Sequence, residues 1–316
     1  MDNYDLVISG GRVIDPENNL DQLRNIGITK GTIKSITTAS IEGDISIDAG
    51  GLVVAPGFID MHSHGQLKEN YEIQARDGVT TALELEGGPE DMDNWYENRE
   101  GKATINYGAS VGHMQIRMNV MDDPGELSPV ADAAHRAATD AEIAEIRSRI
   151  ERGLDRGALA VGFGIQYTPA ASRWEILEAF RAAAQYGACC HVHMRGMGHI
   201  DPLSSIDGLE EIIAAGTITG APLHVCHVSS TGLRAAPHLL QIIEEAQSHG
   251  IDVSTECYSY NAALTDLASA MFEEGWQSTL GIDYGQLEWA ETGERLNNES
   301  FARYREEGGM VIMHMI

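Results

Sequence analysis

The sequence has few cationic side chains and no long hydrophobic run. Lys and Arg number 21 against 48 Asp and Glu, which leaves a formal net charge of −27 at pH 7. This charge repels nucleic acid phosphates and anionic membrane surfaces, so we expect neither as a partner. No segment approaches the ~18 consecutive apolar residues of a membrane-spanning helix. The first residues lack the basic and apolar segments of a secretory signal, so the expected location is the cytoplasm.

Cysteine is also scarce. The four cysteines, Cys189, Cys190, Cys226 and Cys257, have no Cys-x-x-Cys spacing and lie in apolar runs. This favours reduced thiols in the interior over disulfides or a structural zinc site. Because side chains alternate along a strand, the sulfur of Cys226 is expected to point away from whatever His227 faces.

The pattern of apolar residues divides the chain into two parts. Residues 1–54 are short alternating segments separated by Gly, Asn and Asp, which predicts a small β domain. In residues 55–316, strand-like runs alternate with helical patterns such as 141–154 and 174–187, the second ending at a Gly187 C-cap. The strand-like runs are 58–62, 79–86, 105–113, 159–164, 188–193, 223–227 and 253–258.

A strand followed by a helix, repeated along the chain, predicts a parallel sheet. No Gly-x-Gly-x-x-Gly nucleotide-binding fingerprint is present. The predicted fold class is therefore α/β, with a (β/α)8 TIM-type barrel favoured over a doubly wound sheet.

The first run ends in His62-Ser63-His64-Gly65. Residues two apart on a strand point to the same side and can share one metal ion, and imidazole suits zinc and related transition metals. The alternative is a pair of surface histidines in a turn. The buried-strand pattern of residues 51–59 favours the metal.

Other strand ends carry further polar groups. Glu84 and Glu86 share a face of the second strand, where carboxylates are costly unless they are paired or bound to a cation. The alternative is a carboxylate held by backbone donors or an arginine. The fifth and sixth strands end at His193 and His227, and the fourth has no lysine to form a bridging carbamate.

With these residues, the chain resembles the metal-dependent amidohydrolase superfamily, and within it the D-aminoacylase (N-acyl-D-amino-acid deacylase) branch. The similar motifs span nearly the whole chain, at 56–64, 78–81, 111–117, 162–167, 193–195 and 257–260. The resemblance implies zinc, one or two ions, with His193 and His227 as the tight ligands and His62 and His64 completing a second position. It also implies Tyr167, Arg195, Tyr258 and Tyr260 as substrate contacts; the alternative for each tyrosine is packing at the rim of the barrel.

Three departures from the family pattern are visible. The family commonly has a cysteine at the end of its second strand, where this chain has Glu86, the inferred replacement, with Glu84 as the other choice. The lysine that usually follows the sixth-strand histidine is absent from Val228-Ser229-Ser230. The catalytic aspartate of the family lies on its eighth strand, so it is expected beyond Ile316, together with strands that complete an N-terminal β-sandwich; the chain is expected to be truncated.

The implied function is zinc-dependent hydrolysis of a small-molecule amide, an N-acyl-D-amino acid or a related D-amide. A cyclic-amide hydrolase of the dihydroorotase or hydantoinase kind shares His-x-His and is the second candidate. The third is a catalytically inactive metal-binding fragment. The sequence leaves the oligomeric state open.

Overall fold

The computed structural model describes residues 4–198 and 204–314. The chain forms two compact units, one of Met1–Ile59 with Gly78–Thr80 and the other of Asp60–Asp77 with Thr81–Ile316. The predicted domain boundary, after residue 54, lies a few residues before Ile59, where the first segment of the first unit ends. The second unit contains every residue that the sequence predicts for the site.

The first unit is a five-stranded sheet of short strands. Its order is β3-β2-β1-β4, and β5 also pairs with β1. The turn between β2 and β3 is Lys30-Gly31, and both residues have positive φ (52° and 71°), as a tight two-residue hairpin turn requires. The second sheet of the expected sandwich stays a prediction. The strands are β1 (Tyr4–Asp15), β2 (Leu20–Thr29), β3 (Thr32–Thr37), β4 (Gly43–Asp48) and β5 (Val53–Val54).

The seven predicted strand runs all form strands. They make two sheets, ordered β6-β7-β8 and β9-β10-β11-β12-β13, and only Ser110 separates β8 from β9 in the chain. The pairs β7–β8, β9–β10, β10–β11, β11–β12 and β12–β13 are parallel. The strands are β6 (Phe58–Asp60), β7 (Val79–Glu84), β8 (Asn106–Ala109), β9 (Val111–Gly112), β10 (Ala160–Gly164), β11 (Cys189–His193), β12 (Leu223–Val225) and β13 (Val253–Thr255).

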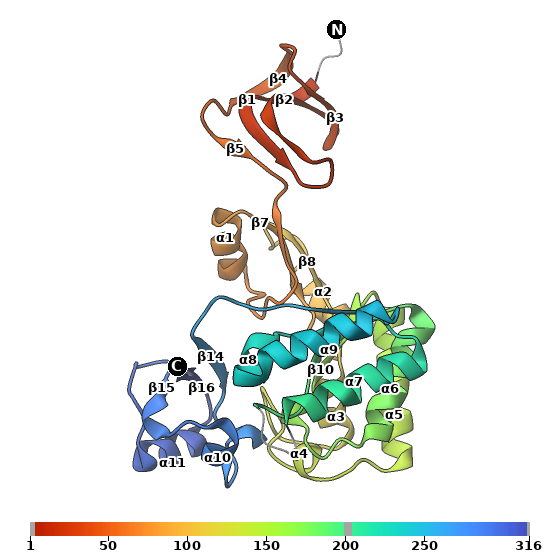
Figure 1. Ribbon diagram of the computed structural model, residues 1–316, viewed down its shortest axis with the longest axis vertical. Helices are drawn as coiled ribbons and strands as arrows, with labels where there is room; N and C mark the ends of the chain where they lie inside the picture. The colour runs from red at the N-terminus through yellow and green to blue at the C-terminus, as the bar shows by residue number, and fades with distance from the viewer. Residues whose placement is uncertain (1–3, 199–203, 315–316) are drawn as a thin grey trace. The chain divides into compact units, whose positions relative to one another are not determined.

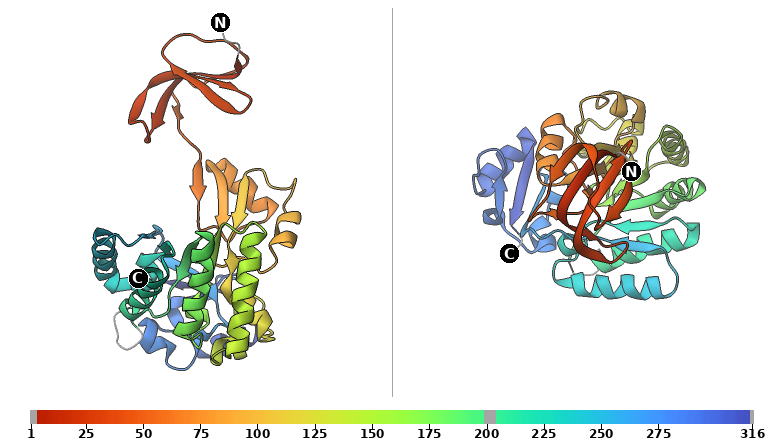
Figure 2. Two further views of the ribbon diagram at one scale, coloured as in Figure 1. Left: turned by 90° about the vertical axis from the view of Figure 1, so that its right-hand side faces the viewer. Right: turned by 90° about the horizontal axis from the view of Figure 1, so that it is seen from above.

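Helices separate most of these strands. Helices α5, α6, α7 and α9 lie next to one another on the outer side of the strands (Figures 1 and 2). Among the described residues, no helix is both long enough and apolar enough to cross a bilayer. The helices are α1 (Lys68–Arg76), α2 (Met92–Glu97), α3 (His113–Val120), α4 (Asp132–His135), α5 (Asp140–Asp155), α6 (Arg173–Tyr186), α7 (Ser205–Thr219), α8 (Val228–Gly232) and α9 (Ala236–Ser248), with short 3-10 turns η1 (Ile165–Tyr167) and η2 (Leu233–Ala235).

Local sequence explains where the two predicted helices begin and end. Thr139 and Glu142 form a capping box at the start of α5, which satisfies backbone donors that have no partner within the helix. Ser172 caps α6, and Gly187 ends it with φ 63°, a left-handed conformation that glycine adopts at little cost. The sequence predicts this C-cap correctly.

Residues 262–314 form a second, antiparallel element. The sheet order is β14-β16-β15, and its core includes two stacked aromatic pairs, Trp276 with Phe301 and Trp289 with Tyr304. The apolar run that begins at Met310 is the central strand of this sheet; its last two residues, 315 and 316, lie outside the described part. The elements are β14 (Ala262–Asp266), η3 (Ala270–Phe272), α10 (Trp276–Leu280), η4 (Tyr284–Gln286), β15 (Leu287–Trp289), α11 (Asn298–Glu307) and β16 (Met310–His314).

Candidate metal centre

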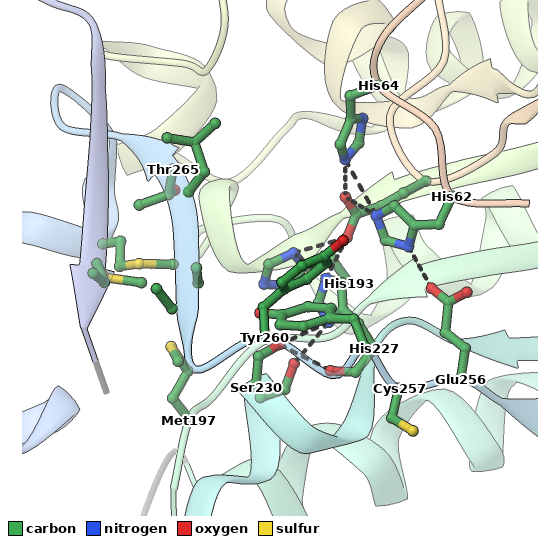
Figure 3. A pocket seen from close by; sticks show the side chains of 18 of the residues that line it. His62, His64, His193, Met197, His227, Ser230, Glu256, Cys257, Tyr260 and Thr265 are labelled. Carbon is green, nitrogen blue, oxygen red and sulfur yellow. Dashed lines mark hydrogen bonds and ion pairs between the residues drawn. The ribbon is translucent and has the colours of Figure 1, made fainter. Parts of the chain in front are cut away.

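The carboxylate of Glu86 contacts four imidazole rings. Figure 3 shows these rings, which belong to His62, His64, His193 and His227. Its Oε1 lies 2.7 Å from Nε2 of His227 and 2.9 Å from Nδ1 of His193. Its Oε2 lies 3.2 Å from Nε2 of His62 and 3.1 Å from Nε2 of His64. The two oxygens therefore serve two separate pairs of histidines, the pairs that the resemblance assigns to two metal positions.

The ends of parallel strands bring these residues together. His193 is the last residue of β11, and Glu86 follows β7 in the turn before Gly87 and Gly88. His62 follows β6 and pairs its backbone with Glu84. The carboxyl ends of parallel strands meet at one edge of the sheet, so residues far apart in the chain meet there.

His227 lies just beyond β12 in a left-handed conformation, with φ 61° and ψ 68°. This conformation is uncommon for a residue with a Cβ atom and marks local strain. The chain turns here, and the ring is held by its Nδ1, 3.2 Å from Oγ1 of Thr231. The opposite nitrogen faces Glu86.

The same turn overturns the expectation for Cys226. Its sulfur lies within 4.8 Å of ligand atoms of His62 and Glu256, and so on the side of the site that His227 also faces. Strand β12 ends at Val225, so strand alternation does not extend to Cys226 and His227. Burial raises the pKa of the Cys226 thiol well above its ordinary value.

The electrostatics of the site suit a cation. Burial would raise the pKa of Glu86, but the charges and hydrogen bonds of His227 and His193 lower it well below its usual range. Burial opposes the charged form of His62 and His64, yet the surrounding glutamates raise their pKa values to about 10 and about 11. Burial lowers the pKa of His193. Negative charge is thus concentrated where the imidazole nitrogens converge.

The donor set fits a transition metal. Ligand atoms of His62, Glu86 and His227 all lie within 4.8 Å of one another, as do those of His62, Cys226 and Glu256. Imidazole nitrogen and carboxylate oxygen are common zinc ligands, and both are abundant here.

Glu84 contacts His64 from the side away from Glu86. Its Oε2 lies 2.8 Å from Nδ1 of His64, and its Oε1 accepts a hydrogen bond from the Gly87 amide at 3.1 Å. Glu86, in contrast, contacts all four histidines. The geometry supports Glu86 as the ligand and Glu84 as the carboxylate that orients His64.

Glu256 belongs to the site and is absent from the residues that the sequence suggests. It follows Thr255, the last residue of β13, and its Oε1 accepts from Nδ1 of His62. Burial opposes its ionisation, but the neighbouring His224 and His62 rings lower its pKa to about 2. The sequence does contain a signal for Glu256, because it is an acidic residue in the predicted strand 253–258. The same argument, a carboxylate in a buried strand, identifies Glu86.

A cavity of about 520 Å³ opens over these groups. Three of the four predicted substrate contacts line it: Tyr167, Tyr258 and Tyr260. Tyr167 packs edge-on against His193, with ring centroids 5.1 Å apart, and its hydroxyl lies 3.1 Å from Oγ1 of Thr265.

Arg195 does not line this cavity. Its Nε forms an ion pair with Glu211 at 2.8 Å, and its guanidinium donates to the carbonyls of Pro169 and Ala171 at 2.9 and 2.8 Å. These contacts tie β11 to neighbouring loops. A substrate-binding role for Arg195 stays a prediction of the resemblance, and in this structure its donors point to protein groups.

The wall across the cavity from the histidines is apolar. Figure 3 shows Met197 and Thr265 of β14 on this side. No Lys or Arg is among the described residues that line the cavity. The other apolar members of the wall are Ala262, Ala263, Leu264, Met271 and Met313.

Residues 46–240 match the amidohydrolase family, and the chain belongs to this family. The D-aminoacylase of Alcaligenes xylosoxydans xylosoxydans is 31% identical over 310 residues, covering 84% of this chain and 59% of the relative. The N-acyl-D-glutamate deacylase of the same organism is 27% identical and covers 96% of this chain and 65% of the relative. The chain thus spans about three fifths of the length of these curated relatives.

A solved structure shares the fold. The N-acyl-D-glutamate deacylase from Bordetella bronchiseptica, complexed with zinc and a phosphonate inhibitor, superposes with a TM-score of 0.77 at 21% identity, over 99% of this chain and 72% of that chain. The α/β fold of this chain is therefore an amidohydrolase fold.

Proposed function

We propose that this chain is the metal-binding part of a zinc-dependent hydrolase of linear carbon–nitrogen amides, of the N-acyl-D-amino-acid deacylase kind. The observation that carries the proposal is the Glu86 carboxylate, with one oxygen toward His193 and His227 and the other toward His62 and His64. Such a carboxylate can bridge two metal positions, so one or two zinc ions are proposed. The D-aminoacylase relative supports the reaction class.

When bound, zinc would supply a Lewis acid for the amide carbonyl and lower the pKa of a water molecule. The chain's own residues perform the remaining tasks. The four histidines and Glu86 would hold the metal, while Glu84 orients His64 through Nδ1. Tyr167 would contact substrate. Among residues 4–198 and 204–314, no aspartate hydrogen-bonds to the ring of any of the four histidines, so a proton-transferring aspartate stays a prediction.

The fold proposed to carry this site is the TIM-type barrel of the superfamily. Support comes from strands β6 to β13, which follow one another in chain order, from the parallel pairs among β7 to β13, and from the helices on their outer side. Residues 1–54 are proposed as the small β domain and 55–316 as the hydrolase barrel. A cytoplasmic location is proposed, which agrees with four free cysteines among the described residues.

The proposed substrate is a D-amide with an uncharged, apolar group beside the scissile bond. One of the deacylase relatives is named for N-acyl-D-glutamate, a substrate with a second carboxylate. Placing a second carboxylate against the methionine-rich wall would cost free energy, because no Lys or Arg of the described lining compensates it. A small-molecule amide is the partner that this cavity suits.

Binding tests this proposal without requiring the proton-transferring group. The zinc-loaded chain is titrated calorimetrically with N-acetyl-D-leucine, N-acetyl-L-leucine and N-acetyl-D-glutamate. We expect the D-leucine compound to bind at least ~10-fold more tightly than the other two, a difference of about 1.4 kcal/mol. Leu264→Arg places a cation at an exposed lining position and should improve binding of the glutamate compound. Equal binding of all three by the wild-type chain would contradict the proposal.

The cyclic-amide hydrolase remains the second candidate. Strand β10 (Ala160–Gly164) offers no lysine for a bridging carbamate, and Glu86 stands where a bridge is needed. Dihydroorotate and hydantoin in the same titration decide between the candidates. Binding of zinc with no binding of any amide would support the third candidate, a metal-binding fragment.

A further inference from the structure

Glu256 lies between the rings of His62 and His224. We propose that Glu256 is a positioning residue, which holds His62 through Nδ1 so that Nε2 faces the metal. The Nε2 atom of His62 lies 3.2 Å from Oε2 of Glu86 and 3.2 Å from Nε2 of His64. The opposite nitrogen, Nδ1, is paired with Oε1 of Glu256 (Figure 3). The two edges of the ring thus have separate partners.

The chemistry of imidazole makes this arrangement consequential. A neutral ring has one N–H and one nitrogen with a free lone pair. Which nitrogen carries the proton depends on the hydrogen bonds that the two nitrogens make. A carboxylate beside Nδ1 accepts a hydrogen bond from Nδ1–H, which keeps the proton there and leaves the lone pair on Nε2 for a metal. Histidine ligands of metals almost always have such a partner, which also fixes the orientation of the ring.

The ring of His224 lies next to the carboxylate of Glu256. Its Oε2 lies 3.6 Å from Nε2 of His224, whose Nδ1 lies 2.9 Å from Oγ of Ser254. His224 and Ser254 are register partners on β12 and β13, so the sheet fixes their separation. The ring of His224 also packs against that of His191, with centroids 4.7 Å apart.

The line Ser254–His224–Glu256–His62 therefore runs from β13, the last strand in the sheet order, to the metal-facing side of the cavity. His224 is buried and does not line the cavity. This placement suits a residue that acts on the metal through Glu256 and His62.

This inference rests on the proposed metal centre, and the experiment separates the two. Zinc affinity and stoichiometry are measured by competition with a chromophoric chelator, for the wild-type chain and for Glu256→Ala, Glu256→Gln and Glu256→Asp. Glu244→Gln, an exposed position on α9, is the matched control. Melting of the metal-free proteins checks that each variant folds.

We expect Glu256→Ala to bind zinc ~10- to 100-fold more weakly at the His62–His64 position, the range typical of lost partners of metal ligands. Glu256→Gln keeps an acceptor oxygen and should lose less. Glu256→Asp keeps the charge but shortens the side chain, so it should resemble Glu256→Ala. Affinity for zinc at the His193–His227 position should change little. In the cobalt-substituted protein, only the absorption bands of the ion at the His62–His64 position should change.

His224 gives a second, independent readout. His224→Phe keeps a buried ring but removes the nitrogen that faces Glu256. It should weaken the same position by a smaller factor, and it should add nothing in a chain that already carries Glu256→Ala. Additive effects would mean that His224 and Glu256 act separately, which overturns the proposed line.

Three results would contradict the inference. Unchanged zinc affinity in Glu256→Ala would show that the contact with His62 has no effect on the metal. Loss of zinc as complete as in His62→Ala would identify Glu256 as a ligand. A lower melting temperature of the metal-free Glu256→Ala protein with unchanged zinc affinity would assign Glu256 a purely structural role. A wild-type chain that binds no zinc would overturn the metal centre itself.

Discussion

Oε1 of Glu86 and Nε2 of His227 lie 2.7 Å apart although 141 positions separate the two residues in the chain. The contact joins the turn after β7 to the left-handed residue after β12. Both side chains are buried, and each follows the carboxyl end of a strand in a different one of the two sheets. This contact connects the second strand, where the family commonly has a cysteine, to a predicted tight ligand.

Substitutions of Glu86 should change metal content in a fixed order. Glu86→Ala should lose most of the zinc, because it removes the carboxylate that contacts all four histidines. Glu86→Cys supplies the ligand type of the resembling family and should retain it. Glu84→Ala is the matched control and should have the smaller effect, since Glu84 contacts only His64 among the four. Elemental analysis of chains purified without chelator measures this; a larger loss in Glu84→Ala than in Glu86→Ala would reverse the two roles.

Tyr167 is expected to donate a hydrogen bond to substrate over a wide pH range. Burial, together with the charge of Glu86, raises the pKa of its hydroxyl above the ordinary value of 10.0, so the phenol stays protonated. Tyr167→Phe should weaken binding of an N-acyl-D-amino acid by about 0.5–1.5 kcal/mol, the net worth of one hydrogen bond. Calorimetry at pH 7 and 9 measures this. Tyr186→Phe, at an exposed position, is the control. An equal loss of binding affinity in Tyr186→Phe would contradict the substrate contact assigned to Tyr167.

A buried cluster outside the site should control acid stability. Glu175 is fully buried with Arg117 and with His113, whose Nε2 lies 2.9 Å from the carboxylate. Burial would raise the pKa of Glu175, but the hydrogen bonds and charges of His113 and Arg117 lower it below 4.5. Because the folded-state pKa lies below the unfolded one, this stabilisation is complete above pH ~4.5 and is lost as pH falls through the folded-state value.

Glu175→Gln should therefore flatten the acid side of the stability curve. It should also cost about 3–5 kcal/mol near neutral pH, because the Arg117 charge stays buried without its counter-ion. Urea unfolding between pH 3 and 7 measures both effects. A variant with the same acid slope as the wild-type chain would show that another carboxylate is responsible.

Thiol reactivity should single out Cys257. It is exposed, whereas Cys190 and Cys226 are buried and Cys189 is half-buried with its pKa raised to about 11 by burial and by Asp252. Thiolates are the reactive form, so one thiol per folded chain should react rapidly with a disulfide reagent, and four should react after denaturation. In Cys257→Ser the rapid phase should disappear. Rapid reaction of a second thiol would show that the strands around Cys189 open.

The sequence predicts the strands of the second unit and most of the site because both depend on local patterns. The ends of apolar runs locate His62, His64, His193 and His227, although β6 ends at Asp60, before the first two. The distance between these residues in the chain is irrelevant once parallel pairing aligns the strand ends, as with Gly164 and His193. For this reason a list of strand ends serves as a list of site residues.

The remaining features depend on contacts that a pattern does not contain. His227 reaches the site from a left-handed conformation beyond the end of β12, and Cys257 is exposed in the segment that follows β13. The antiparallel sheet of residues 262–314 depends on pairing between β14 and β16, which are far apart in the chain. Arg195 is held by Glu211, a partner on a different element that the motif does not reveal.

Zinc content is the most direct test of the central claim that Glu86 and the four histidines form a metal centre. Elemental analysis of the chain purified without chelator should give about one to two zinc ions per chain. The double variant His193→Ala, His227→Ala should give close to none, while Arg152→Gln, an exposed substitution on α5, should keep the wild-type value. Wild-type zinc content in the double variant would contradict the account.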